Sequence, residues 1–204
     1  MTKVEKLRLT ERVQGEVAAL RVENLLCRQY LAKSAAAFSP TNFNRFRDML
    51  HGAWWLIALE AYDDAKRLLD ALCEVDDDFY WMFEWLASTF ATRAWLYSQQ
   101  GNTEASQADA EAVCRWLARD PNAKPLRVAE YHKALERCDI WYTPAENDSS
   151  VKSSASMLCT ALTLLVLYQQ MAQARAEPEE AQGYAERITV ALALLKQKLT
   201  STSR

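Results

Sequence analysis

Apolar residues recur at steps of three and four along most of the chain, the spacing that places side chains on one face of an α-helix. The first such pattern is uninterrupted, and its members are Leu9, Val13, Val17, Leu20, Cys27, Leu31 and Phe38. Thr2 and Glu5 have the spacing of a capping box, and Pro40 disfavours a helical conformation in the residue before it. The pattern therefore predicts one long amphipathic helix that begins near Thr2 and ends before Ser39.

The same spacing, with capping or helix-breaking residues between the segments, predicts seven further helices. Six of them are expected at residues 43–60, 79–100, 103–119, 125–141, 151–176 and 178–199. The remaining one follows residues 43–60, is capped by Asp63 and carries Ala65, Leu68, Leu69 and Leu72. Residues 143–150 are the most loop-like part of the chain. Because the connections are short, consecutive helices are expected to pair as antiparallel hairpins.

Composition narrows the fold class to all-α. Half of the 204 residues are hydrophobic, which is enough for one substantial core, and only four glycines and five prolines are available for tight turns. We therefore expect one all-helical domain over residues 1–204, with about eight helices arranged either as a regular hairpin array or as an irregular bundle.

Several apolar positions resemble the core positions of tetratricopeptide repeats. The first unit has Ala53, Leu56, Tyr62, Ala65, Leu69 and Leu72, and the second has Phe90, Ala94, Tyr97 and Gly101. Residues 178–181 resemble the turn of such a repeat followed by the alanine of its second helix. In the second unit Ser106 stands where that alanine is expected, and corresponding positions are about forty residues apart rather than thirty-four. The resemblance implies stacked hairpins and a role in binding proteins.

Charge is distributed unevenly along the chain. Residues 1–50 carry a net charge of +4, residues 51–125 carry −7, and residues 126–204 carry zero. Phosphate contacts need clustered cations, which the acidic middle third lacks, so nucleic acid is not expected as a ligand. A protein partner with a basic surface is the natural complement.

Cysteine usage and hydropathy indicate the compartment. The five cysteines are odd in number and widely spaced, each in an apolar helical context, as is typical of buried free thiols. Residues 1–12 are too charged for a signal peptide, and the nearly apolar stretch 157–168 is too short to span a bilayer. We therefore expect a cytoplasmic protein that does not contact a membrane.

The sequence contains little that indicates catalysis. His51 and His132 are the only histidines, and neither belongs to a metal or catalytic motif. Asp48 and His51 share a helical face without the second copy that a bridged metal pair needs, and His132 with Glu136 is an ordinary helical pair. No cysteine spacing for zinc and no glycine-rich phosphate loop occurs. We expect no metal, no cofactor and no enzymatic activity.

The helix expected at 79–100 is apolar on two faces. Phe79, Phe83, Leu86, Phe90 and Tyr97 share one face, and Trp81, Trp85, Ser88, Thr92 and Trp95 lie roughly opposite. One interpretation is a central helix that is packed on both sides. The other is that the tryptophan face lines a groove, where tryptophan serves as a binding anchor.

An acidic run precedes this helix. Glu74, Asp76, Asp77 and Asp78 lie before it and Glu84 one turn inside, where they act either as a solvated capping turn or as a surface that attracts a basic partner. The candidate binding residues are Asp76, Asp77, Asp78, Trp81, Glu84, Trp85 and Trp95. The expected function is to bind and hold a specific protein, as an immunity-type inhibitor of a toxin or as an adaptor or chaperone. The alternative is a helical regulator or enzyme with a tryptophan-lined small-molecule pocket, and homo-oligomerisation is left open.

Overall fold

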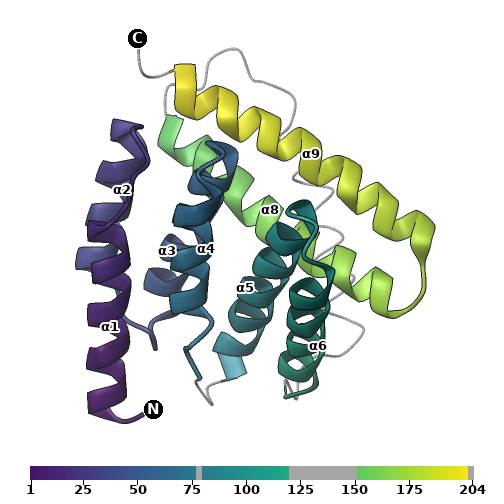
Figure 1. Cartoon of the computed structure of the whole chain (residues 1–204), viewed down its shortest axis with the longest axis horizontal. Helices are drawn as coiled ribbons and strands as arrows, with labels where there is room; N and C mark the ends of the chain where they lie inside the picture. The colour runs from purple at the N-terminus through teal and green to yellow at the C-terminus, as the bar shows by residue number, and fades with distance from the viewer. Residues whose placement is uncertain (77–79, 120–150, 202–204) are drawn as a thin grey trace.

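The computed structural model describes residues 1–76, 80–119 and 151–201, and in these ranges it contains helices and no strand. In chain order the helices are α1 (Lys3–Ala18), α2 (Leu25–Ala36), α3 (Phe43–Ala58), α4 (Tyr62–Leu72), α5 (Tyr80–Gln99), α6 (Thr103–Arg119), α8 (Val151–Ala174) and α9 (Pro178–Ser201). Adjacent helices from α1 to α6 pack against one another side by side, and the α8–α9 pair runs obliquely across them (Figure 1). The all-α prediction is confirmed, whereas the helix expected at 125–141 and the loop at 143–150 lie outside the described residues.

The expected single helix from Thr2 to Phe38 is wrong, because the chain turns back between α1 and α2. The Asp64 carboxylate accepts the N–H groups of Arg21 and Val22 at 2.8 and 2.9 Å, which holds the connection in a non-helical conformation. Asn24 then caps α2 by accepting the N–H of Cys27 at 2.9 Å. The apolar period continues across the turn, so periodicity alone does not reveal the break.

Helix starts agree with the sequence in some places and differ in others. The predicted capping box is confirmed, since Thr2 Oγ1 accepts the Glu5 N–H and Glu5 Oε2 accepts the Thr2 N–H. Asp63 is not the cap of α4, because Ala61 occupies that position without a side-chain hydrogen bond and Asp63 lies in the first turn. An acid in this turn still complements the helix dipole.

Three hairpins share one turn geometry. Glu60, Gly101 and Ala176 follow α3, α5 and α8 with φ of 61°, 72° and 57°. In each turn the next residue donates its N–H to the carbonyl five residues earlier, at 2.9 Å in every case. This is the hydrogen bond of a Schellman motif, in which a left-handed residue ends the helix and reverses the chain. Glycine fits that conformation without strain, whereas the two other residues have a Cβ that opposes it.

The helix α8 lies at the centre of the molecule. It packs against α3, α5, α6 and α9 (Figure 1). Within it, residues 155–174 are long and apolar enough to cross a membrane, so the sequence-based estimate of a shorter stretch is corrected. Because 72% of that window is buried inside the protein, α8 has the environment of a core helix.

Four cysteines lie in the described residues, and all four are free thiols. Cys27 and Cys159 are buried, as expected from their apolar context, and burial raises the pKa of Cys27 to about 12. Cys73 is half-buried and Cys114 is exposed, so the expectation of a buried thiol is wrong for Cys114. Cys138 lies outside the described residues.

We predict that the Asp64→Ala variant loses about 3 kcal/mol of unfolding free energy, because two backbone N–H groups and Arg67 lose their acceptor in a buried place. Asp63→Ala is the matched control, since Asp63 is the exposed neighbour in the same turn and should cost no more than about 0.5 kcal/mol. Urea unfolding of both variants gives the two values. Equal losses would contradict the role assigned to Asp64.

The turn geometry predicts that Ala176→Gly stabilises the protein by about 0.5 to 1 kcal/mol, because glycine removes the steric cost of the left-handed conformation. The opposite sign is expected for Ala32→Gly, in the exposed centre of α2, where glycine lowers stability by about 1 kcal/mol. Thermal unfolding at equal protein concentration compares the two. If both substitutions destabilise, Ala176 does not have the conformation described.

Candidate partner-binding site

Three of the predicted binding residues, Asp76, Glu84 and Trp85, lie in the stretch where α4 leads into α5. Asp76 is 77% exposed at the side chain, and Glu84 and Trp85 are half-buried on the first turns of α5. Trp95 lies half-buried further along the same helix. Asp77 and Asp78 lie outside the described residues, as does the side chain of Trp81. The structure therefore describes two acids of the run, Glu74 and Asp76, and both are exposed. Asp76 lies close in sequence to Trp85, which packs on the core.

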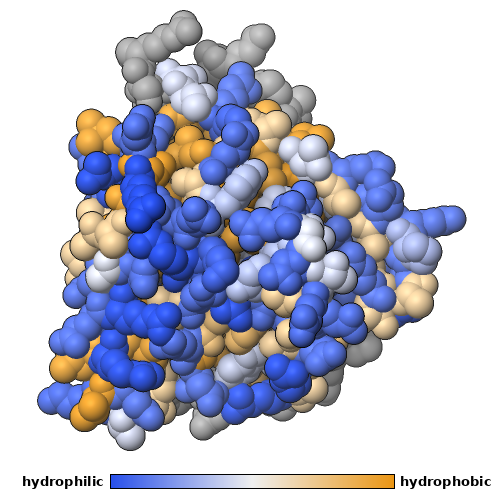
Figure 2. Space-filling model, in the orientation of Figure 1, coloured by the Kyte–Doolittle hydropathy of each residue, from blue (hydrophilic) through white to orange (hydrophobic). Residues whose placement is uncertain are grey.

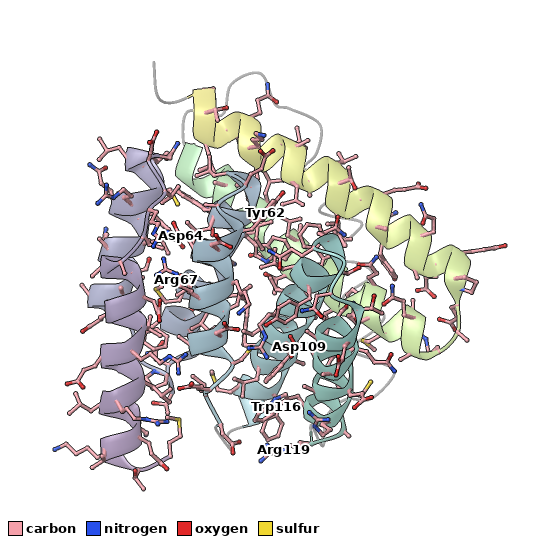
Figure 3. The ribbon with its side chains drawn as sticks, in the orientation of Figure 1. Tyr62, Asp64, Arg67, Asp109, Trp116 and Arg119 are labelled. Atoms are coloured by element: carbon pink, nitrogen blue, oxygen red, sulfur yellow. The ribbon has the colours of Figure 1, made fainter. Side chains whose placement is uncertain are left out.

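Asp76 is linked through Arg119 to a pair of tilted aromatic rings between α5 and the end of α6. Arg119 pairs with Asp76 at 3.3 Å, and its guanidinium lies 4.4 Å from the centre of the Trp116 ring and 5.5 Å from that of Phe83. The Phe83 and Trp116 rings are 5.7 Å apart. Figure 3 shows Trp116 and Arg119 at the lower end of α6, in the same region as the start of α5. A cation on an aromatic face contributes about 0.5 to 1 kcal/mol at an exposed site.

Sequence reasoning missed Trp116 and Arg119 because they belong to the next helix. The available signal was their spacing on α6. Trp116 lies four residues after Ala112 and Arg119 three residues after Trp116, which places the arginine beside the tryptophan on one helical face. Their contact with Asp76 depends on the α5–α6 hairpin, which brings together residues 43 positions apart. The junction is therefore a composite of α4, α5 and α6.

The tryptophan face of α5 is directed towards α3. Ser88 and Thr92 on this face are buried, and the rings of Trp95 and Trp54 are 5.9 Å apart. Trp54 continues the contact by donating its Nε1 hydrogen to Thr163 Oγ1 of α8 at 3.1 Å. Since α8 packs on both α3 and α5, it occupies the side of these helices that would otherwise be open. Among the described side chains of this face, Trp85 is the tryptophan closest in sequence to the acidic run, whereas Trp116 of α6 is linked to Asp76 through Arg119.

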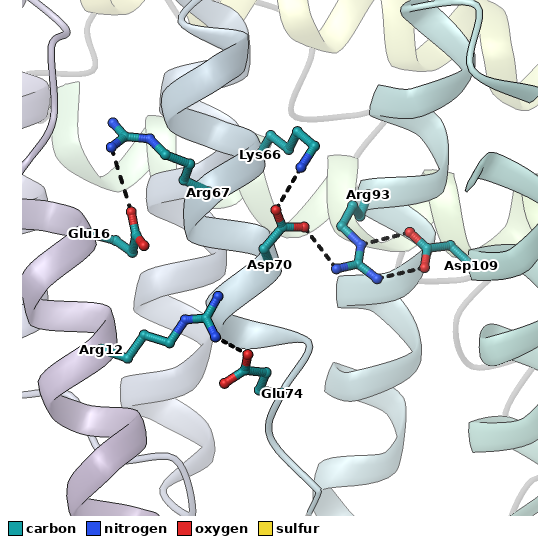
Figure 4. A network of polar contacts seen from close by, with 8 residues as sticks. All are labelled: Arg12, Glu16, Lys66, Arg67, Asp70, Glu74, Arg93 and Asp109. Carbon is teal, nitrogen blue, oxygen red and sulfur yellow. Dashed lines mark hydrogen bonds and ion pairs between the residues drawn. The ribbon is translucent and has the colours of Figure 1, made fainter.

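The opposite face of α5 contributes to an ion-pair network. Arg93 binds Asp109 of α6 through two hydrogen bonds of 2.7 Å and Asp70 of α4 through one of 2.9 Å, and Asp70 also pairs with Lys66 (Figure 4). Burial opposes the charged form of Arg93, but the hydrogen bonds to Asp109 and the neighbouring charges outweigh it and raise its pKa. The planar fork of arginine suits this two-acid arrangement.

Two further pairs connect α4 to α1. Arg12 pairs with Glu74, and Arg67 pairs with Glu16 at 3.7 Å (Figure 4). Arg67 also bonds to Asp64 at 2.6 Å. Glu74 was grouped with the acidic run in the sequence, but here its charge is compensated by a cation of the same chain. Several acids of the middle segment are therefore structural, and the excess negative charge is smaller at the surface than the sequence count indicates.

His51 is enclosed between α3 and α8. The residue is 1% exposed, and its Nδ1 and Nε2 atoms lie 3.5 and 3.3 Å from the hydroxyl oxygens of Ser156 and Thr160. Burial, with a smaller effect from the charge of Arg47, lowers its pKa to about 3. A neutral, enclosed imidazole that bridges two helices has a structural role. His132 lies outside the described residues.

Among the described residues, no group of three histidine, cysteine or acidic side chains has the arrangement of a metal site. Comparisons with protein-family models, with curated proteins and with solved structures find no match. The interpretation of the junction therefore rests on the geometry of this chain.

The environment of His51 predicts a specific pH dependence. Its pKa is about 3 in the folded protein and 6.5 in the unfolded chain, so the unfolded state binds more protons as pH falls through this window. Between pH 7 and pH 5 this linkage should remove about 2 kcal/mol of unfolding free energy, and the His51→Gln variant should lack that loss. Urea unfolding at both pH values measures it, and His132 cancels because both proteins contain it. Equal pH dependence in the two proteins would show that His51 is not enclosed as described.

Proposed function

We propose that this protein binds and holds a specific protein partner with a basic surface, and that it does so without catalysis. The architecture supports this role because arrays of helical hairpins present extended surfaces rather than a single reactive cleft. In the three hairpins with the shared turn, a small residue follows five positions after the left-handed one: Ala65, Ser106 and Ala181. This regularity supports the resemblance to tetratricopeptide repeats, whose usual role is protein binding.

The observation that carries the proposal is the composition of the α4–α5 junction. An exposed acid, Asp76, and a half-buried acid, Glu84, lie close in sequence to the half-buried Trp85, which packs on the core. An aromatic side chain that is already packed against the core loses little conformational entropy when it binds a partner. Charged residues around it attract the partner and fix its orientation. This combination suits a protein surface that carries lysine or arginine.

The charge of the wider surface supports the same partner. Asp63, Glu104 and Glu111 are exposed on α4 and α6, in addition to the acids that pair within the chain. A negative potential spread over these helices accelerates encounter with a basic protein, and salt weakens the effect. Asp77 and Asp78 add to the charge in the sequence.

Among protein binders, we favour an immunity-type inhibitor of a toxin that acts in the cytoplasm. A compact acidic chain suits the blocking of a basic enzyme. An adaptor or chaperone requires the same surface, and the alternative of a regulator or enzyme requires a small molecule held by the α5 tryptophans. Capture of the partner from the native cell with the full-length tagged protein, followed by mass spectrometry, tests this. A captured protein indicates an inhibitor, adaptor or chaperone rather than a regulator or enzyme that binds a small molecule.

The activity of the captured partner then distinguishes an inhibitor from an adaptor or chaperone. If the partner is a toxin, its expression alone should stop growth, and co-expression of this protein should restore it. An adaptor or chaperone leaves the activity of its partner intact. Failure to capture any protein stoichiometrically, together with saturable binding of a small molecule, would overturn the proposal.

For the identified partner, we predict that charge reversal of Asp76, Asp77 and Asp78 to lysine slows association at least about tenfold at low salt and has less effect at high salt. The matched control reverses Asp63, Glu104 and Glu111, which changes net charge equally at other positions. Stopped-flow or surface-based kinetics at several salt concentrations measures the difference. If both triple variants slow association equally, the field of the whole protein acts and the junction has no special part.

Trp85→Ala should act mainly on dissociation. Loss of an aromatic anchor that becomes desolvated in the complex should cost at least about 2 kcal/mol of binding free energy, or about thirtyfold in dissociation rate. Because Trp85 also packs on the core, its unfolding must be measured alongside, and Trp85→Phe should restore the fold more fully than the affinity. A folded Trp85→Ala protein that dissociates at the normal rate would remove Trp85 from the site.

A further inference from the structure

The guanidinium of Arg119 lies between an acid and two aromatic rings. It pairs with Asp76 at 3.3 Å, and it is 4.4 Å from the centre of the Trp116 ring and 5.5 Å from that of Phe83. Arginine stacks on aromatic faces and pairs with carboxylates through its planar fork, so Asp76 and the two rings together form a binding site for a guanidinium group. In the free protein, an arginine of the same chain fills this site.

The aromatic part of the site is fixed by the core. Phe83 is 6% and Trp116 8% exposed, their rings are 5.7 Å apart, and both residues belong to the main hydrophobic cluster. The described surface around the lower end of α6 is mostly hydrophilic, so these rings are covered rather than displayed (Figure 2). Because the core holds the rings from behind, their position does not depend on Arg119.

The charged part of the site is exposed to solvent. The side chain of Arg119 is 42% exposed and that of Asp76 77%, and both ion pairs and cation–π contacts are weak at exposed positions. Arg93 is the opposite case, because its side chain is only 17% exposed and forms two hydrogen bonds of 2.7 Å with Asp109. Arg93 is therefore fixed, whereas the side chain of Arg119 can turn into water without disturbing the core.

An arginine of a partner can make the same contacts as Arg119. The rest of the interface would position the incoming guanidinium, and only the weak contacts of Arg119 would be lost in exchange. A lysine would gain less, because its ammonium group is a compact, strongly hydrated charge that does not stack on a ring as a planar guanidinium does. The site is therefore expected to distinguish arginine from lysine on the basic surface.

We propose that Arg119 occupies the place of an arginine of the partner, whose guanidinium displaces Arg119 from between Asp76 and the Trp116 ring when the two proteins bind. The inference rests on the function proposed above and specifies which cation the partner presents at this point. Since Arg119 competes with the partner for the same site, its removal should strengthen binding.

An oligoarginine peptide and an oligolysine peptide of equal length, both fluorescently labelled, serve as probes. Fluorescence anisotropy with the full chain at low salt gives their dissociation constants. Arg119→Ala should bind the arginine peptide at least about threefold more tightly than the wild type does, because a weak competing contact is removed. The gain should be smaller for the lysine peptide. Thermal unfolding should show that the variant remains folded.

The matched control is Arg115→Ala, which removes the same charge from an exposed position one turn earlier on α6. It reports how much any lost cation helps an acidic protein to bind a basic peptide, and its gain should be smaller than that of Arg119→Ala. A second comparison isolates the acid of the site. The double variant Arg119→Ala/Asp76→Asn should lose the gain, whereas Arg119→Ala/Asp63→Asn, with a neutralised exposed acid on α4, should retain most of it.

Equal gains in Arg119→Ala and Arg115→Ala, weaker binding of the arginine peptide by Arg119→Ala, or an equal gain for both peptides would overturn the inference. Because the probes replace the native partner, this result is separate from the test of the proposed function. A captured basic partner that binds wild type and Arg119→Ala equally would overturn the displacement of Arg119 and leave the proposed function intact.

Discussion

The arrangement of the N-terminal half depends on the Asp64 carboxylate. One of its oxygens accepts the N–H groups of Arg21 and Val22, and the other accepts a hydrogen bond from Arg67, whose guanidinium also reaches the carbonyl of Ala19. A buried carboxylate needs such partners, and a reversed backbone segment needs acceptors for its free N–H groups. Because each satisfies the other, the chain turns back between α1 and α2 instead of continuing as one helix, which creates the hairpin whose outer face is exposed.

The short helix α4 connects the two halves of the described structure. Asp64 at its start holds the α1–α2 turn, Asp70 at its centre pairs with Arg93 of α5, and Glu74 after its end pairs with Arg12 of α1. These acids account for part of the negative charge that the sequence assigns to residues 51–125. Charge that is paired within the chain contributes less to partner recognition, and Asp76 also has such a pair, with Arg119. The proposed binding role of Asp76 therefore rests on its exposure, since 77% of its side chain remains accessible.

The sequence predicts a helix and its ends correctly where capping residues and apolar spacing agree. It fails where the end of a helix depends on a contact with a residue far away in the sequence. The helix at 103–119 was predicted with the bounds that α6 has, since Asn102 caps it and Arg119 ends its pattern. The break at residues 19–24 could not be predicted, because its cause lies 43 positions away at Asp64 and the apolar spacing continues across it. The same limit applies to the site, where Asp76 was predicted from its charge but its contact with Arg119 depends on how α5 and α6 pair.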